Sequence, residues 1–291
     1  MYQSSKDGAK MDKLQNFLGG LRDEVVVLDL GCGYGSFHYE ACNCRIIAMD
    51  VNLPEGSTGS TISRVEYVRA DSRAIPLNNE SIDAVICHHT LEHFADYRTT
   101  LSEIGRVLTP DGWLWIAIPD GNGFDDALYR LVFSGGGHVN RFSYESLITD
   151  VRRITGLQLA QSCLLFSGFV YLKKPTPREL QHFPPTARFL AEVPDGFSVF
   201  GRLALNTATR IIDRIFGSRY SQYGWAFLFT KTTIAMEELP SYFNVCSQCG
   251  SGNSSESVKA NSSRSFFGFR LYHCPHCAEI NVFVPPPRNL Q

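Results

Sequence analysis

Hydrophobic positions fall into two kinds of pattern along the first half of the chain. Short apolar runs without a helical period are typical of parallel strands buried on both faces. Such runs cover residues 25–30, 45–49, 65–69, 82–87 and 113–118. Amphipathic stretches with a helical period predict helices at residues 11–19, 99–108 and 144–154.

The second half continues with less regular segments. Residues 157–172 predict one long strand or two short ones, and residues 224–231 predict a last strand. Residues 173–198 carry five prolines and predict an irregular insertion. Five strands that alternate with helices, followed by two adjacent late strands, predict an α/β fold with a mostly parallel seven-stranded sheet and an antiparallel edge.

A glycine-rich turn follows the first predicted strand. Gly31, Gly33 and Gly35 alternate there, and Ser36 can cap a helix over the next residues, SFHYEAC. A strand, a glycine turn and a helix N-terminus form the first unit of a nucleotide-binding sheet. Dinucleotide folds use Gly-x-Gly-x-x-Gly to hold a pyrophosphate. The different spacing here favours a ligand that needs no phosphate cradle.

Composition limits the possible size of the core, the binding partners and the location of the protein. The chain has 291 residues, 44% of them hydrophobic and 19% charged, with a net charge of −2. It can bury a sizeable core, and it offers no general electrostatic case for nucleic acid. We expect a main domain at residues 1–240 and a small module at 241–291. No secretory signal or membrane-length apolar run is visible, and scattered thiols predict a cytoplasmic location.

The chain resembles the class I S-adenosylmethionine-dependent methyltransferases of the small-molecule and lipid branch. Four elements carry the resemblance: VLDLGCGYG, Asp50, the segment RADSRAIPL, and SIDAVICHHTLEHF followed by LSEIGRVLTPDGWLWIAIPD. The similarity covers roughly residues 10–232, within which residues 173–220 have no counterpart. It implies a Rossmann-like sheet and S-adenosyl-L-methionine as cofactor.

The resemblance also implies cofactor-binding residues. Asp29 and the three glycines should line the methionine end, Asp50 should accept the ribose hydroxyls, and Asp71 should accept from the adenine amino group. The full implied set is Asp29, Gly31, Cys32, Gly33, Gly35, Asp50, Val51, Asp71, Ser72 and His88. A structural role remains open for some of them, since Asp29 can serve only to hold the turn and Asp71 only to cap a helix.

Histidines gather around the end of the fourth predicted strand. His89-Thr-Leu-Glu-His93 matches His-x-x-Glu-His, a zinc-peptidase pattern that requires a helix. The preceding strand favours a different interpretation, in which His88, His89 or His93 faces the methyl acceptor together with His138. An imidazole near pKa 6.5 can take a proton from a hydroxyl or an amine. The alternative is that these rings only shape the pocket floor.

The segment after the fifth strand, SGGGHVNRFS, joins a glycine run to His138 and Arg141. In similar enzymes this segment borders the acceptor, so we expect His93, His138 and Arg141 to contact it. Arg141 could hold a carboxylate, a phosphate or a sugar acid. The alternative is a loop arginine paired with a nearby carboxylate.

The C-terminal tail carries two Cys-x-x-Cys pairs. Cys246, Cys249, Cys274 and Cys277 have the spacing of a zinc ribbon with tetrahedral structural zinc. A rubredoxin-like iron site shares this spacing, and two disulfides would suit a cytoplasmic chain poorly. Arg264, Arg270 and the neighbouring residues Phe266, Phe267 and Phe269 could contact nucleic acid or a protein partner.

An amphipathic helix is predicted over residues 199–216. Its apolar stripe is formed by Val199, Leu203, Ala208, Ile211, Ile212 and Ile215, and Arg202, Arg210 and Arg214 lie opposite. Two interpretations are open: a lid packed on its own domain, or an interfacial helix in peripheral contact with an anionic membrane.

The expected activity is methyl transfer to a small-molecule, glycan-precursor or lipid acceptor. Two alternatives remain at this point. One is a nicotinamide-dependent oxidoreductase on the same fold, and the other is a non-catalytic adaptor that acts through the ribbon.

Overall fold

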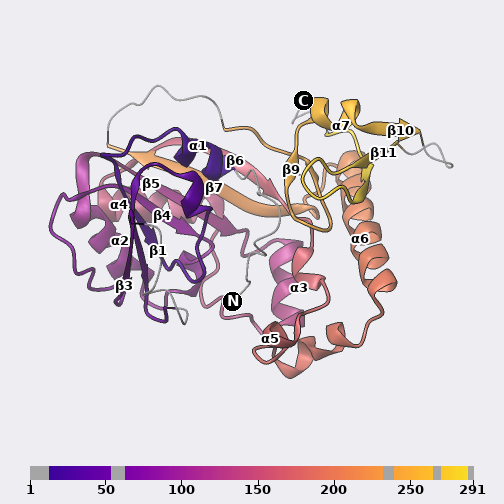
Figure 1. Ribbon diagram of the computed structural model, residues 1–291, viewed down its shortest axis with the longest axis horizontal. Helices are drawn as coiled ribbons and strands as arrows, with labels where there is room; N and C mark the ends of the chain where they lie inside the picture. Colours follow the sequence, from indigo (N-terminus) through magenta and orange to yellow (C-terminus); the bar gives the residue numbers. More distant parts are fainter. Residues whose placement is uncertain (1–12, 54–62, 232–238, 265–269, 288–291) are drawn as a thin grey trace.

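A computed structural model describes residues 13–53, 63–231, 239–264 and 270–287. Its main sheet has seven strands in the order β3-β2-β1-β4-β5-β7-β6, and β7 runs antiparallel to both of its neighbours. The predicted mostly parallel seven-stranded sheet with an antiparallel edge is therefore confirmed (Figure 1). The strands are β1 Val26–Leu30, β2 Arg45–Asp50, β3 Val65–Arg69, β4 Ile82–His88, β5 Leu108–Pro119, β6 Gln158–Phe166 and β7 Gln222–Thr230.

Helices cover both faces of the sheet. Successive residues of a strand point to opposite faces, so in β4 Val85 and Cys87 pack in one core while Ala84 and Ile86 pack in the other. The first core includes α2 and α4, and the second includes α1. The α-helices are α1 Lys13–Gly19, α2 Tyr97–Val107, α3 Phe124–Val132, α4 Tyr144–Thr155, α5 Pro177–Leu180, α6 Asp195–Phe216 and α7 Ser255–Ala260.

Two local predictions differ from the structure. The helix expected after the glycine turn is only a single 3-10 turn, η1 (Tyr39–Ala41), because the Ser36 side chain binds Asp29 instead of capping a helix. Conversely, α3 was not expected. Residues 52–63, which are too rich in Gly, Ser and Pro to predict a full crossover helix, lie mostly within 54–62, outside the described residues.

The insertion predicted from its prolines consists of short elements and one long helix. The short elements are η4 (Val170–Leu172), α5 and η5 (Pro185–Ala191), and a small core joins η5 to α3. In Figure 1, α3, α5 and α6 lie beside the sheet, on the same side as the C-terminal module. No helix in the part of the chain that the structure describes is long and apolar enough to cross a membrane.

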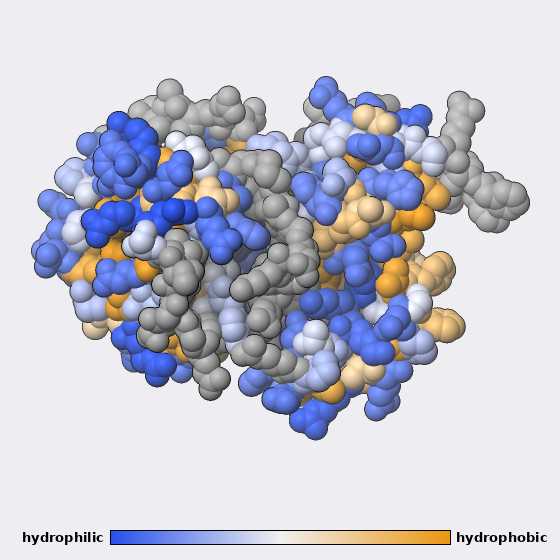
Figure 2. Space-filling model, in the orientation of Figure 1, coloured by the Kyte–Doolittle hydropathy of each residue, from blue (hydrophilic) through white to orange (hydrophobic). Residues whose placement is uncertain are grey.

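Helix α6 packs through its polar face. The side chains of Arg202, Asn206 and Arg210 are buried, and they donate hydrogen bonds to backbone carbonyls of the C-terminal module at Ser247, Val245 and Phe243, over 3.1, 3.0 and 2.6 Å. The predicted apolar stripe faces outward at Ala208, Ile212 and Ile215, so packing of the whole stripe on its own domain is wrong. Hydrophobic side chains follow this edge of the molecule in Figure 2. Membrane contact stays a prediction.

The C-terminal module is a small β structure. Its strands are β8 Asn244–Val245, β9 Gly252–Asn253, β10 Ser262–Arg264, β11 Arg270–His273 and β12 Ile280–Phe283. The pair β8–β9 and the sheet β10-β11-β12 are both antiparallel. Phe266, Phe267 and Phe269, expected as a partner surface, lie outside the described residues. The division of the chain at residue 240 stays a prediction.

Candidate functional site

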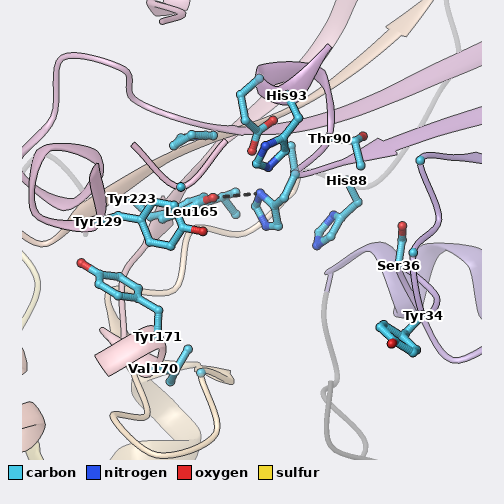
Figure 3. A pocket seen from close by; sticks show the side chains of 18 of the residues that line it. Tyr34, Ser36, His88, Thr90, His93, Tyr129, Leu165, Val170, Tyr171 and Tyr223 are labelled. Atoms are coloured by element: carbon cyan, nitrogen blue, oxygen red, sulfur yellow. Dashed lines mark hydrogen bonds between the residues drawn. The ribbon is translucent and has the colours of Figure 1, made fainter. Parts of the chain in front are cut away.

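A single large cavity of about 1530 Å³ extends across the carboxyl ends of the central strands. One end is lined by the glycine turn, Asp50 and Val51. The other end is lined by residues of α3, β6, the insertion and the C-terminal module. Figure 3 shows His88 between the side chains of Tyr34 and Ser36 on one side and those of Tyr129, Tyr171 and Tyr223 on the other. The volume exceeds the usual 300–1,000 Å³ of one small-ligand pocket, so two ligands can fit together.

Backbone hydrogen bonds hold the glycine turn against β2. The N–H groups of Gly31 and Cys32 donate to the carbonyl oxygen of Met49, over 2.8 and 3.0 Å. The Gly33 N–H donates to Asp50 Oδ2 over 2.9 Å, and the Asn52 N–H donates to Asp50 Oδ1 over 2.8 Å. The Asp50 carboxylate is thereby fixed at the rim of the cavity. Each of its oxygens keeps a further lone pair for a ligand hydroxyl.

The three glycines of the turn have positive φ angles, of 73°, 49° and 107°. Only glycine adopts this conformation without strain. A Cβ on Gly31 would lie 2.7 Å from the Thr90 side chain, whereas a Cβ on Gly33 would meet nothing within 4 Å. Gly33 thus leaves open space in the cavity wall.

Asp29 lies beneath the turn and is fully buried. Its carboxylate accepts hydrogen bonds from the Ser36 N–H and hydroxyl over 3.0 and 2.6 Å, and from the Tyr39 hydroxyl over 2.5 Å. Burial raises its pKa, while these hydrogen bonds act in the opposite direction. Asp29 is not among the residues described as lining the cavity. The structure therefore places it where it holds the turn.

Asp71 and Ser72, which the resemblance places at the adenine, follow β3 on the outside of the described cavity wall. Asp71 forms an exposed ion pair with Arg73 at 2.6 Å, and this pair lowers the pKa of Asp71 to about 2. The Ser72 hydroxyl lies 2.9 Å from that of Thr100. Their contact with a cofactor stays a prediction. Cys32, Val51 and His88 do line the cavity.

The histidines near β4 point in different directions. His89 has a φ of 56°, a conformation rare for a residue with a side chain, and its Nδ1 lies 3.1 Å from the Tyr223 hydroxyl. The centroid of the His88 ring lies 4.2 Å from that of the His89 ring. His93 belongs to a single 3-10 turn, η3 (Leu91–His93), so the helix that the zinc-peptidase pattern requires is absent from residues 89–93. That alternative is wrong.

His93 and His138 both line the cavity, with ring centroids 4.8 Å apart, and His93 is exposed. Partial desolvation, together with the neighbouring His138, lowers the pKa of His93 to about 4. His138 is stacked on Tyr129 and hydrogen-bonded through Nδ1 to Asp126 Oδ1 at 2.6 Å. The sequence pattern placed these two histidines at one site, and the geometry brings them together.

Arg141 is exposed and does not line the described cavity wall. Arg130 holds this segment instead. It donates to the carbonyl oxygens of His138 and Asn140 over 2.5 and 3.0 Å, and it pairs with Asp126 at 2.5 Å. A contact between Arg141 and an acceptor stays a prediction.

The sequence analysis assigned no binding or catalytic role to several residues that line the cavity. They are mostly aromatic or acidic, and they include Glu92, Asp125, Tyr129, Phe133, Tyr171, Phe183 and Tyr223. Four of these seven lie on α3 or the 3-10 turn η3, or directly after α3. A signal for α3 was present: Asp125 and Asp126 occupy its first turn, and Arg130 follows Asp126 by four residues.

The four cysteines of the tail form one close cluster. One ligand atom from each lies within 4.8 Å of the others, and the Sγ atoms of Cys246 and Cys277, and of Cys249 and Cys274, are 3.7 Å apart. All four thiols are free, so the two disulfides are not formed. The module also lines the cavity, through Tyr242, Val245 and residues 250–252.

Comparisons with known proteins agree with this geometry. A family model described as a methyltransferase domain matches residues 28–116. A demethylmenaquinone methyltransferase from Deinococcus radiodurans is 32% identical over 37% of this chain and 49% of its own length. A protein from Mycobacterium tuberculosis described as a "probable S-adenosylmethionine-dependent methyltransferase" is 31% identical over 50% of this chain and 48% of its own length. The chain therefore spans about half the length of these curated relatives.

Solved structures agree at the level of the fold. A methyltransferase from Archaeoglobus fulgidus covers 75% of this chain and 90% of its own, with 16% identity and a TM-score of 0.50. The residues that match the family model include the glycine turn and β4, and the mostly parallel sheet with an antiparallel edge is that expected from the resemblance. Residues 28–116 are therefore similar to a methyltransferase domain, and the fold agrees with that similarity.

Proposed function

We propose that this protein transfers a methyl group from S-adenosylmethionine to a small-molecule acceptor with an apolar body. The observation that carries the proposal is the continuous cavity, because it joins the glycine turn and Asp50 to an end lined by histidines and aromatic rings. A bound cofactor and a bound acceptor would then share one continuous space. Methyl transfer requires that arrangement, since the acceptor atom must reach the methyl carbon from the side opposite sulfur.

The cofactor end has the groups that the ligand needs. Asp50 can accept hydrogen bonds from the two ribose hydroxyls with its remaining lone pairs, and Gly33 leaves room beside it. His88 lines the cavity next to this region. Because the sulfonium is already activated, the protein mainly has to align the nucleophile, the methyl group and the sulfur.

The acceptor end favours an apolar ligand. Tyr129, Phe133, Tyr171 and Phe183 pack edge to face or stacked along its wall, and rings of this kind bind flat apolar groups. The relative from Deinococcus radiodurans is named for demethylmenaquinone, an acceptor of that character. Lipid and glycan-precursor acceptors remain predictions, because this aromatic wall favours them less than it favours a flat apolar acceptor.

A base near the acceptor would serve a hydroxyl or amine acceptor. The acceptor's electron pair forms the bond to the methyl carbon, the carbon–sulfur bond breaks, and the acceptor proton passes to an imidazole or to water. His89 is positioned for this role because its Nδ1 is held by the Tyr223 hydroxyl at 3.1 Å. A positioned base contributes roughly 10²–10⁴-fold to the rate.

Calorimetry with S-adenosylhomocysteine tests the proposal. We expect Asp50→Ala to weaken binding about 10–100-fold, the value of hydrogen bonds to a charged group. Asp111→Ala is a matched control, because Asp111 is exposed on β5 and does not line the described cavity. No binding by the unmodified protein, or equal binding after Asp50→Ala, contradicts the proposal. Binding of NADH in place of S-adenosylhomocysteine would support the oxidoreductase alternative.

We further propose that the cysteine cluster holds one structural zinc ion. Zinc–sulfur bonds of about 2.3 Å in a tetrahedron place the sulfur atoms about 3.8 Å apart, and the two shortest observed separations are 3.7 Å. Four thiolate ligands leave no open position, so this metal would have no hydrolytic role.

A further inference from the structure

A buried carboxyl group lies without a partner at the acceptor end of the cavity. Glu92 is 1% exposed, and within the described residues neither of its carboxylate oxygens has a hydrogen-bond partner. Burying an unpaired carboxylate costs several kcal/mol. An unsatisfied buried group of this kind usually marks a place where a ligand, an ion or water completes the structure.

Two imidazoles next to Glu92 present free ring nitrogens. His93 Nδ1 lies 3.0 Å from the carbonyl oxygen of Gly137, which can only accept, so this nitrogen carries the proton. His138 Nδ1 lies 2.6 Å from a carboxylate oxygen of Asp126 and carries the proton for the same reason. In the neutral form of each ring, the second nitrogen, Nε2, keeps its lone pair. Metal-bound histidines are held by partners of this kind, a backbone carbonyl or a carboxylate on the other nitrogen.

The three side chains converge on one point. One ligand atom each from Glu92, His93 and His138 lies within 4.8 Å of the other two. Ligands of a shared ion, at 2.0–2.2 Å from it, stand about 3–3.5 Å from one another, so the three side chains would move closer together around the ion. The backbone supports the arrangement, because the carbonyl oxygen of Glu92 accepts from the N–H groups of Val139 and Asn140, both at 3.0 Å.

Local charge also suits a cation. Arg130 is the nearby positive side chain, and its ion pair with Asp126 at 2.5 Å neutralises it. Burial raises the pKa of the unpaired Glu92 carboxyl group, and a bound cation would favour its ionised form. A divalent ion would supply the missing partner of that carboxylate.

We infer that Glu92, His93 and His138 bind one divalent transition-metal ion at the acceptor end of the cavity. Two imidazoles and one carboxylate are the ligand set that suits Fe²⁺, Mn²⁺, Co²⁺ or Zn²⁺, and three protein ligands leave open positions toward the cavity. The site stands on its own geometry. Its role rests on the proposed methyl transfer: the ion would hold an acceptor oxygen and favour loss of its proton.

Cobalt titration of the full chain tests the inference. The chain is first loaded with zinc so that the cysteines are occupied, and CoCl₂ is then added under calorimetry and visible spectroscopy. We expect one Co²⁺ per chain in addition to the zinc, without the charge-transfer band of a cobalt–thiolate bond. Glu92→Gln and His138→Asn should each weaken cobalt binding at least about tenfold. His182→Asn is the matched control, because His182 lines the cavity outside the cluster.

Thermal unfolding separates a binding defect from a folding defect. Cobalt should raise the Tm of the unmodified protein and of His182→Asn, but not that of Glu92→Gln or His138→Asn. If Glu92 is only an unpaired buried acid, Glu92→Gln raises the Tm and leaves cobalt binding unchanged, which would overturn the inference. No cobalt beyond the zinc, or occupancy only at millimolar cobalt, would overturn it as well.

S-adenosylhomocysteine is titrated into the same samples. Binding of S-adenosylhomocysteine without a cobalt site would leave the proposed methyl transfer standing and remove the metal. A cobalt site without S-adenosylhomocysteine binding would leave the metal site standing and contradict the proposed methyl transfer. The two proposals therefore fail separately.

Discussion

The two ends of the cavity are built in different ways. The cofactor end uses the backbone of residues 31–36 and the carboxylate at the end of β2, all within twenty residues of sequence. The acceptor end uses side chains from η3, α3, β6, β7 and the C-terminal module. A site made of backbone is encoded in a short local pattern. A site made of distant side chains exists only once the whole chain has folded.

The two ends also differ in how their acidic groups are satisfied. At the cofactor end, both oxygens of Asp50 accept backbone N–H groups before any ligand arrives. At the acceptor end, Glu92 and Asp125 are buried, and both oxygens of Glu92 and Oδ2 of Asp125 have no hydrogen-bond partner among the described residues. The first end is therefore preorganised, whereas the second carries a free-energy cost that a ligand or an ion can relieve.

Loss of the ribbon metal should have the largest effect and should be confined to the acceptor end. A small module with little core depends on its metal for folding, worth roughly 10 kcal/mol or more. We expect Cys249→Ser to lose the zinc and the hydrogen-exchange protection of β8, β9, β11 and β12. Cofactor affinity should stay within a few-fold, because the ribbon does not reach the glycine turn. Elemental analysis, hydrogen exchange and calorimetry measure the three quantities.

Cys163→Ala is the control for that experiment, because Cys163 is buried in β6 and lies outside the cysteine cluster. It should keep the zinc. Iron in place of zinc, or a metal-free ribbon that stays protected, would contradict the prediction. An equal loss of cofactor affinity would show that the two ends are not independent.

Arg210 connects helix α6 to the C-terminal module and to the segment that follows β6. The side chain is fully buried and donates to the carbonyl oxygens of Phe243, Asn206 and Ser167, over 2.6, 3.0 and 2.8 Å. Arg210→Ala leaves these carbonyls without a donor and opens a cavity, so we expect a loss of about 3–5 kcal/mol in the free energy of unfolding. Urea denaturation measures it.

Arg214→Ala is matched to that change. Arg214 lies one turn further along α6 and donates to the carbonyls of Pro285 and Pro286, but it is exposed. We expect a loss of at most about 1 kcal/mol. Equal effects of the two substitutions would show that burial of Arg210 is not what stabilises this region.

The difference between the two ends explains how far the sequence reasoning reached. The strands, the glycine turn and Asp50 were predictable because period, spacing and turn chemistry are local properties. For α6 the period predicted an amphipathic helix, but it could not say which face is buried. Arg202 and Arg210 are buried because backbone carbonyls of a module some forty residues further along the chain accept from them.

The same limit applies to Asp29 and Glu92. The spacing that put Asp29 next to the glycine turn was informative, yet Ser36 and Tyr39 occupy its carboxylate, and no pattern specifies that pairing. Glu92 was visible only as part of a peptidase-like motif. The lack of a hydrogen-bond partner for its carboxylate oxygens is a property of tertiary packing.

The buried carboxyl group of Asp125, at the acceptor end, should make the free energy of unfolding depend on pH. Burial raises its pKa from 3.8 to about 7. Between these values the folded state holds a proton that the unfolded state has lost, so the free energy of unfolding falls as pH rises from about 4 to about 7. Above pH 7 the full cost is present, up to about 4 kcal/mol. Asp125→Asn removes it, so the variant should gain stability relative to the unmodified protein as pH rises.

Asp96→Asn provides a control of opposite sign. Asp96 caps α2, and hydrogen bonds from Thr99 lower its pKa. Its contribution is present at neutral pH and is lost as pH falls, so this variant should lose stability relative to the unmodified protein as pH rises. Urea denaturation between pH 4 and pH 8.5 measures both differences. A flat difference for Asp125→Asn would mean that its carboxyl group is hydrated or paired in the folded protein.

Gly33→Ala should have a small effect on stability and still separate the two ends. The backbone at Gly33 has a φ of 49°, and an added Cβ would meet no atom within 4 Å. The cost to folding is therefore only that of a left-handed residue with a side chain, about 1–2 kcal/mol. Gly156→Ala is matched to it, because Gly156 has a φ of 75° and equal free space but ends α4, far from the glycine turn. We expect similar losses of stability, with S-adenosylhomocysteine affinity reduced roughly tenfold or more only for Gly33→Ala. Equal affinities in the two variants would mean that the space beside Gly33 is not occupied by the cofactor, and the preorganised end of the cavity would need another ligand.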